Sequence, residues 1–129
     1  MLTFPYLRKG QHHFPVADVT LTIPGRPLTV KALVDSGASL SVFRAEVLAY
    51  LQIPLDKGER MHLEGVGGRI QGYRHRLPVQ VGSVRFPLTI VFSAELTISF
   101  NLLGRDNFFE QFLVTFDERQ HVVRLQSYR

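Results

Sequence analysis

An aspartate stands at the end of a stretch that otherwise has the pattern of a half-buried strand. Apolar and polar residues alternate over residues 28–34, which predicts a strand with one buried face. Asp35 follows, and the next three residues, Ser36, Gly37 and Ala38, are all small. Small residues leave room for backbone or a ligand to approach the carboxylate. Such a carboxylate is a candidate for acid–base chemistry on a bound molecule.

Two predicted strands and a tight turn position Asp35 at the end of a sheet. Residues 16–23 alternate in the same way as the stretch before Asp35. Between the two stretches, Pro24-Gly25 predicts a β-turn, because proline fixes φ at the first central position and glycine accepts a positive φ at the second. We therefore expect the strand over residues 27–34 to lie beside the first one.

The rest of the chain adds further strands and little helix. Apolar residues at helical spacing between residues 43 and 51 predict a short helix with Ser41 as its N-cap. Residues 77–81 and 84–92 alternate on either side of Gly82-Ser83, which predicts a hairpin.

The last third of the chain completes a mostly β fold. Residues 101–103 predict a short apolar strand that Gly104 stops, and residues 106–111 predict one or two helical turns. Residues 112–126 predict a C-terminal hairpin. Together the elements indicate seven or eight short strands and two short helices in a closed or sandwiched antiparallel structure.

Composition indicates one globular domain over residues 1–129. The chain is 45% hydrophobic and 20% charged, and its 129 residues can form one core. No apolar run approaches the roughly 18 residues of a membrane span, and the first residues lack the apolar region of a signal peptide. We therefore expect a cytoplasmic protein with no membrane contact. Residues 1–15 are expected to be an extension of the domain or a removable pro-segment.

Neither nucleic acid nor a metal ion is an expected partner. The net charge is +4, but the basic residues are scattered, with their densest cluster at residues 74–76, so a solvated basic surface is the simpler reading. His12 and His13 are adjacent, and adjacent side chains on a strand point to opposite faces. Since no cysteine, histidine and aspartate set at ligand spacing accompanies them, we expect no metal and no cofactor.

A second unusual segment is rich in glycine. In LEGVGGRIQGY, residues 63–73, one apolar residue, Val66, is surrounded by Gly65, Gly67, Gly68 and Gly72. Glycine is costly inside a strand, so this cluster predicts a hairpin tip that is mobile or approaches another group closely. A phosphate-binding loop is disfavoured because the lysine and hydroxyl residue of that motif are missing. We expect residues 60–77 to form a hairpin that carries Val66 over an aspartate.

Three segments together resemble the retropepsins, the single-domain aspartic proteases of retroviruses and their cellular and bacterial relatives. ALVDSGAS, residues 32–39, resembles the catalytic turn of this family, and EGVGGRI, residues 64–70, resembles its flap tip. FNLLGRD, residues 100–106, resembles the strand and the Gly-Arg-Asp/Asn motif that support the catalytic loop. The order of the segments matches the family as well. The resemblance implies a retropepsin-like closed antiparallel β-barrel or sandwich with a flap hairpin, and hydrolysis of peptide bonds.

The resemblance also implies a homodimer. The family's reaction uses two carboxylates that share one proton around a water molecule. This chain has a single Asp-Ser-Gly turn and is too short for the second lobe of a pepsin, so the other carboxylate is expected to be Asp35 of a second copy. The implied partners are this second copy and a peptide or protein substrate. The alternative is a catalytically silent relative that binds a peptide or a partner protein in the same groove.

Residue roles follow from the same resemblance. Asp35 would be the catalytic carboxylate, Ser36 would donate its hydroxyl across the dimer axis, and Gly37 would leave room for the substrate backbone. The expected substrate contacts are Leu33, Ala38, Gly65, Val66, Gly67, Phe100 and Leu102.

The region behind the catalytic loop matches the family only in part. Gly104, Arg105 and Asp106 are expected to support the loop from behind. The viral enzymes carry an aspartate in place of Ser39 and pair it with the arginine that matches Arg105, and the uncharged Ser39 cannot form that ion pair. The helix after the turn and the long tail over residues 112–129 are more similar to bacterial and cellular relatives.

Overall fold

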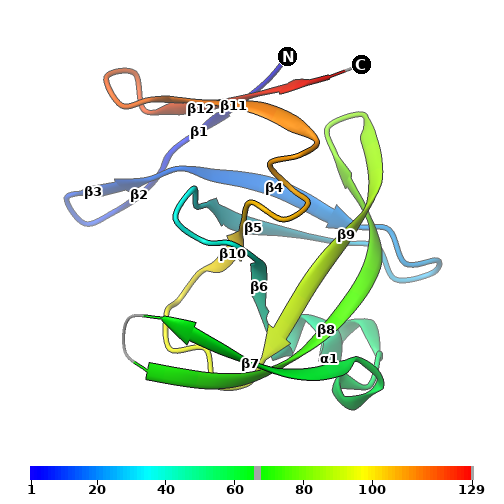
Figure 1. The fold of residues 1–129 in the computed structure, drawn as a ribbon. Coiled ribbons are helices and arrows are strands. Elements are labelled where there is room, and N and C mark those ends of the chain that lie inside the picture. Colours follow the sequence, from blue (N-terminus) through cyan, green and yellow to red (C-terminus); the bar gives the residue numbers. More distant parts are fainter. Residues whose placement is uncertain (66–67, 129) are drawn as a thin grey trace.

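The computed structural model describes residues 1–65 and 68–128, and these residues form mainly strands (Figure 1). The helical elements are α1 (Ala45–Leu51) and a single 3-10 turn, η1 (Leu55–Lys57). The strands are β1 (Leu2–Pro5), β2 (Leu7–Lys9), β3 (His12–Phe14), β4 (Val16–Leu21), β5 (Leu28–Val34), β6 (Ser41–Arg44), β7 (Glu59–Gly65), β8 (Gly68–Val81), β9 (Val84–Ser93), β10 (Asn101–Leu103), β11 (Phe112–Asp117) and β12 (Val122–Ser127).

The main sheet closes on itself. Its seven strands run in the order β4-β5-β10-β6-β9-β8-β7, and β4 also pairs with β8. The closed, mostly β arrangement predicted from the sequence is therefore confirmed. The sheet is mixed rather than wholly antiparallel, because β10 lies parallel to β5 and β6 lies parallel to β9. Parallel partners need long connections, and a period-two pattern carries no information about them.

Two of the predicted hairpins form as the turn residues require. β4 and β5 pair antiparallel, and Gly25 in the turn between them has a φ of 78°. β8 and β9 pair antiparallel around Gly82, whose φ is 60°. Both positions lie in the left-handed region that glycine enters without steric cost.

The terminal segments of the chain form a separate sheet. β12 lies between β1 and β11, with Leu2 opposite Leu125 and Phe112 opposite Ser127. Residues between β1 and β4 add the small hairpin β2–β3. Figure 1 shows the terminal sheet at one end of the molecule, across the β4–β5 hairpin from the β7–β8 hairpin.

One hydrophobic core joins the main sheet, helix α1 and the terminal sheet. Phe43 of β6 and Phe92 of β9 are both fully buried and meet edge to face, with ring centres 5.9 Å apart. Helix α1 contributes Leu48 to the same core. Burying one such side chain stabilises the folded state by about 1.5–3 kcal/mol. A helix of seven residues is too short to be stable alone, so packing against the sheet keeps it folded.

The helical predictions need two corrections. Helix α1 begins at Ala45 and has Arg44 at its N-cap position, while Ser41 lies in strand β6 and is fully buried. Pairing of β6 with β9 and β10 keeps this segment extended, which outweighs the local capping preference of serine. Residues 106–111 form turns instead of a helix, and Asp106 makes a bridge with Leu40. The second short helix is η1, which the sequence pattern did not indicate.

Within the described parts of the chain, no helix has the length and apolar character needed to cross a lipid bilayer.

Candidate functional site

Asp35 is held at the end of β5 by its own main chain. β5 lies between β4 and β10, and β10 runs parallel to it. The Asp35 amide continues this pairing and donates to the carbonyl oxygen of Leu103 at 3.0 Å. One residue earlier, the Val34 amide donates to the carbonyl oxygen of Pro15 at 2.8 Å. The main chain at Asp35 is thus fixed from two sides before the chain turns.

The turn after Asp35 orients its carboxylate. The Gly37 amide donates to Asp35 Oδ1 at 2.9 Å, and the Ala38 amide donates to the carbonyl oxygen of Asp35 at 3.2 Å. A Cβ atom on Gly37 would lie 3.3 Å from Asp35 Oδ1, which is a tight contact, so a side chain there would crowd the carboxylate. The Asp35 side chain itself remains partly exposed.

The segment Gly104-Arg105-Asp106 lies behind this turn and supports it through main-chain hydrogen bonds. The Arg105 amide donates to the carbonyl oxygen of Ala38, and the Asp106 amide donates to that of Ser39, both at 2.9 Å. The Gly104 amide donates to Ser41 Oγ at 3.0 Å. A Cβ atom on Gly104 would overlap the main chain of Leu40, so only glycine lets the two segments approach this closely.

Asp35 opens into a cleft of about 490 Å³. One wall is the turn itself, the second is the β7–β8 hairpin, and the third is the loop over residues 96–98. Most of the side chains in these walls are apolar. The lining residues are Asp35, Gly37, Ala38, Ser39, Leu40, Val42, Leu63, Glu64, Gly68, Ile70, Leu96, Thr97, Ile98 and Leu102. A cleft of this size, lined mainly by apolar side chains and including the Asp35 carboxylate, has the character of a ligand-binding site.

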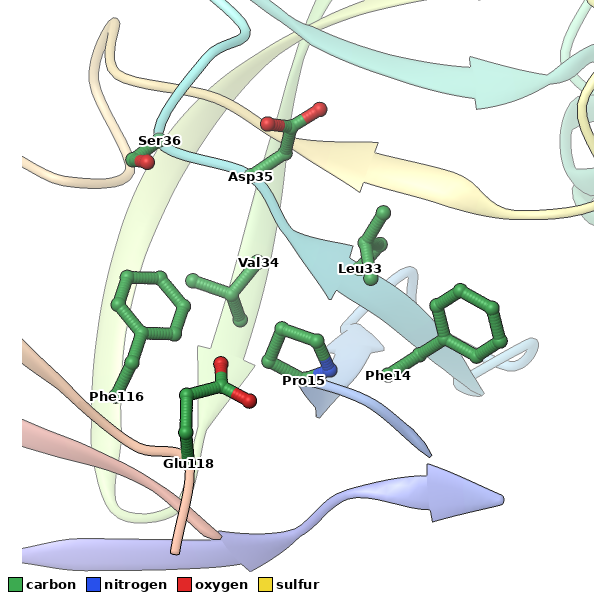
Figure 2. Close-up of a pocket in the computed structure, with 8 residues that line it drawn as sticks. All are labelled: Phe14, Pro15, Leu33, Val34, Asp35, Ser36, Phe116 and Glu118. Atoms are coloured by element: carbon green, nitrogen blue, oxygen red, sulfur yellow. The ribbon is translucent and has the colours of Figure 1, made fainter. Parts of the chain in front are cut away.

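A second cavity of about 410 Å³ lies on the other side of the Asp35 main chain (Figure 2). Its lining residues are Phe14, Pro15, Leu33, Val34, Asp35, Ser36, Phe116 and Glu118. Figure 2 shows the Asp35 carboxylate pointing away from Phe116 and Glu118, while Ser36 lies beside it at the start of the turn. Asp35 therefore lies between the cleft and the second cavity.

A cluster of aromatic and titratable side chains is joined to the second cavity through Glu118, which is one of its lining residues. The rings of His13 and His121 stack with centres 3.9 Å apart. Tyr6 donates from its hydroxyl to Glu118 Oε1 at 3.0 Å. Burial, together with this carboxylate, raises the pKa of Tyr6 to about 12. Loss of water around the ring lowers the pKa of His13, and the charges of neighbouring basic groups lower it further.

The predicted substrate-contact residues divide between the two cavities. Ala38 and Leu102 line the cleft together with Asp35, whereas Leu33 lines the second cavity. Phe100 lines neither: its ring lies 4.9 Å from that of Phe14 and 4.6 Å from Lys9 Nζ. Phe100 is thus packed against the β2–β3 hairpin.

The residues predicted to form a flap tip lie in or next to the part of the chain that the structure does not describe. Gly65 ends β7 and pairs with Gly68, which lines the cleft. Val66 and Gly67 lie outside the described residues.

Four further residues of the cleft were not predicted from the sequence. Leu63 and Ile70 face each other across β7 and β8, and both line the cleft. Both alternate with polar neighbours, and this pattern could have identified them as the inward-facing residues of a hairpin. Leu96 and Ile98 lie in a loop, where no periodicity marks a residue as part of a site.

Among residues 1–65 and 68–128, no three histidine, cysteine, aspartate or glutamate side chains are arranged to hold a metal ion. Of the adjacent pair His12 and His13, His13 stacks its ring on that of His121, an aromatic contact between two histidines.

Comparison with known proteins gives a consistent result. The sequence model of a family described as "Aspartyl protease" matches residues 19–106, a range that contains Asp35 and the supporting segment at residues 104–106. No curated protein sequence matches significantly. Among solved structures, the chain is similar to a retropepsin-like aspartic protease from Rickettsia conorii, with a TM-score of 0.70. The two are 19% identical, and the match covers 95% of this chain and 98% of the other. The likeness shows a retropepsin-like fold.

Proposed function

The chain belongs to the aspartyl protease family, and on this premise we propose that it is an aspartic endopeptidase that is active as a homodimer. One observation carries the proposal. The Asp-Ser-Gly turn at residues 35–37 carries a partly exposed carboxylate, which lines a mainly apolar cleft of about 490 Å³. The membership of the family supports protease activity in general, and the geometry around Asp35 supports the assignment of the catalytic group.

A second carboxylate is needed, and a second copy of the chain is its best source. Two carboxylates that share one proton can activate a water molecule and polarise a carbonyl group at the same time. None of the other described aspartates lines either cavity beside Asp35. Glu64 lines the cleft, but it lies on the β7–β8 hairpin and not in an Asp-Ser-Gly turn. A two-fold axis near Asp35 would supply an identical carboxylate from an identical turn.

The proposed reaction uses the Asp35 pair as acid and base. The ionised carboxylate takes a proton from water, whose oxygen attacks the carbonyl carbon of the peptide bond, while the protonated carboxyl gives its proton to the carbonyl oxygen. The carboxyl that took the proton of the water then gives it to the nitrogen, the bond between carbon and nitrogen breaks, and one hydroxyl of the intermediate returns its proton to the other carboxylate as the new carboxylic acid forms. The pair again holds one proton.

The walls of the cleft support an extended peptide with apolar side chains. Gly37 on one side and Gly68 on the other bring main chain to the cleft without bulky side chains, which suits hydrogen bonding to a substrate main chain. Leu63, Leu96 and Leu102 would contact the substrate side chains. We propose that the β7–β8 hairpin closes over the bound peptide and excludes water.

The direct test is cleavage of a diverse peptide library at several acidic pH values, with Asp35→Asn as the control. Cleavage by the wild type and none by the variant would support the proposal. Peptide binding in the cleft without cleavage by the wild type would instead support a silent binding module. Cleavage that persists in Asp35→Asn would place the chemistry elsewhere in the molecule.

A further inference from the structure

Strands β8 and β9 separate near the cleft, where one strand continues and the other ends. The last pair in their register on this side is Tyr73 with Phe92. If the pairing continued, Gln71 would lie opposite Ala94. Instead β9 ends at Ser93, and the chain turns away into the loop that forms a wall of the cleft. The main-chain groups of Gln71 therefore need other partners.

Two side chains take the place of the missing strand. Ser93 donates from Oγ to the carbonyl oxygen of Gln71 at 2.6 Å, and the Gln71 amide donates to Glu95 Oε1 at 3.0 Å. The Glu95 amide donates in turn to Ser93 Oγ at 3.1 Å. Ser93 is only 2% exposed, so this small ring of hydrogen bonds is anchored in the protein at one corner.

Glu95 thereby marks the point at which the hairpin loses its support from the main sheet. From Gln71 toward Gly68, strand β8 pairs only with β7, which is the last strand of the sheet order. Leu63 and Ile70, which line the cleft, lie on this two-stranded arm. A two-stranded arm on its own is marginally stable, so the last fixed point determines how much of it can bend.

The residue that holds the hairpin also begins the opposite wall of the cleft. Leu96, Thr97 and Ile98 follow Glu95 directly and line the cleft. The carbonyl oxygen of Ile98 accepts a hydrogen bond from Arg44 Nη1 at 2.8 Å, which ties the far end of this segment to the start of helix α1. The hairpin arm and the loop wall are thus linked through one carboxylate.

We propose that Glu95 is a positioning residue that fixes the pivot of the β7–β8 hairpin and so sets how the hairpin covers a bound peptide. The hydrogen bond itself is independent of any activity, whereas its effect on peptide hydrolysis rests on the proposed function. Loss of the carboxylate leaves the Gln71 amide without its acceptor, so Gln71 is held only through its carbonyl oxygen by Ser93 Oγ and the arm bends more easily. Substrate binding weakens as a result, while the acid and base at Asp35 are untouched.

The test compares Glu95→Ala, which removes the acceptor, with Glu95→Gln, which keeps an oxygen acceptor in nearly the same place. Glu110→Ala is the matched control, since it removes an exposed glutamate outside both cavities. Amide hydrogen exchange by nuclear magnetic resonance on the full chain reads the Gln71 amide directly. A lost charge-assisted hydrogen bond should raise exchange at Gln71 roughly tenfold in Glu95→Ala, with little change in Glu95→Gln or Glu110→Ala.

Peptide cleavage provides the second readout. In Glu95→Ala we expect KM to rise roughly fivefold with kcat within about twofold of wild type, because the lost interaction acts on closure over the peptide and not on the chemistry. Glu95→Gln should restore a KM close to that of the wild type. Unchanged exchange at Gln71 in Glu95→Ala would overturn the pivot, and changed exchange with an unchanged KM would overturn its role in covering the peptide. If the wild type cleaves no peptide, the proposed function fails, and the Gln71 exchange still decides whether the pivot exists.

Discussion

The imidazole rings of His13 and His121 lie stacked, 3.9 Å apart and inclined by 13°, and they join the β2–β3 hairpin to the turn between β11 and β12. The two residues are more than a hundred positions apart in the sequence. Loss of water around the ring, and then the electrostatic influence of the neighbouring His121, Arg8 and His12, hold the pKa of His13 below its usual value. The contact is therefore most favourable when His13 is neutral.

This contact predicts that the folded protein loses stability on mild acidification. In the unfolded chain His13 has the ordinary pKa of about 6.5, and its folded-state pKa is lower. The unfolded state thus binds the proton more readily, so the contribution is fully present above pH 6.5 and is lost as the pH falls below it. Urea unfolding between pH 8 and pH 5 should show this slope. His13→Phe, which keeps an aromatic ring but cannot titrate, should have a shallower slope, and His62→Phe on the exposed face of β7 should leave it unchanged.

Asp35→Asn should abolish peptide cleavage and leave the fold intact. The asparagine keeps the shape of the side chain but cannot act as acid or base, so we expect a loss of at least about a thousandfold in kcat/KM. Asp18→Asn is the matched control, because Asp18 pairs on the surface with Lys31 at 2.9 Å. The control should retain activity, and both variants should unfold at nearly the same temperature as the wild type. An active Asp35→Asn variant would refute the assigned role.

The proposal that two chains share one active site predicts a specific mixing result. If each site needs one Asp35 from each of two chains, a mixture of wild type and Asp35→Asn in equal amounts leaves about a quarter of the dimers with two intact carboxylates. Activity per wild-type chain should then fall to about half after exchange of subunits, and further when the variant is in excess. Sedimentation velocity on the same samples reports the dimer. Activity that is independent of added Asp35→Asn would indicate a site complete within one chain.

Gly104→Ala should destabilise the protein through the main chain of Leu40. The added methyl group would overlap Leu40 at a fully buried position, and such overpacking costs about 1–3 kcal/mol or more. Gly25→Ala is a useful comparison, since it meets no atom within 4 Å and only adds the strain of a φ of 78°. Denaturant unfolding should show the larger loss for Gly104→Ala. Its remaining folded fraction should also cleave peptide poorly, because the turn at Asp35 loses its support.

Binding of a non-cleavable peptide analogue should protect the β7–β8 hairpin from hydrogen exchange. In the proposed closed state, residues 60–77 contact the ligand, and bending of the two-stranded arm is suppressed. We expect slower exchange in the distal part of this segment, with no comparable change in the terminal sheet. Equal exchange with and without the bound analogue would mean that the hairpin has no role in covering the cleft.

The part of the site that depends on local sequence was predictable. Asp35 was located because an alternating strand, a Pro-Gly turn and three small residues are all visible within about twenty positions. The support by Gly104 was inferred from a resemblance, and the structure gives its physical reason in the close approach to Leu40.

The rest depends on contacts between distant segments. Ser41 has the character of an N-cap, but pairing with β9 and β10 draws it into a strand. Phe14 and Phe116 come from opposite ends of the chain to form one cavity, and no local pattern connects them. Leu96 lies in a loop without periodicity. Sequence patterns therefore located the candidate catalytic carboxylate and missed much of the surface around it.

The pairing of β1 with β12 has a consequence for engineering. Leu2 lies opposite Leu125, so the first and last strands run side by side and the two chain ends lie at the same end of the terminal sheet (Figure 1). A short linker could join these ends, and new ends could be opened at the exposed Gly82-Ser83 turn, far along the chain from Asp35. Such a circular permutant would keep every strand pair of the terminal sheet while changing the order in which the strands leave the ribosome.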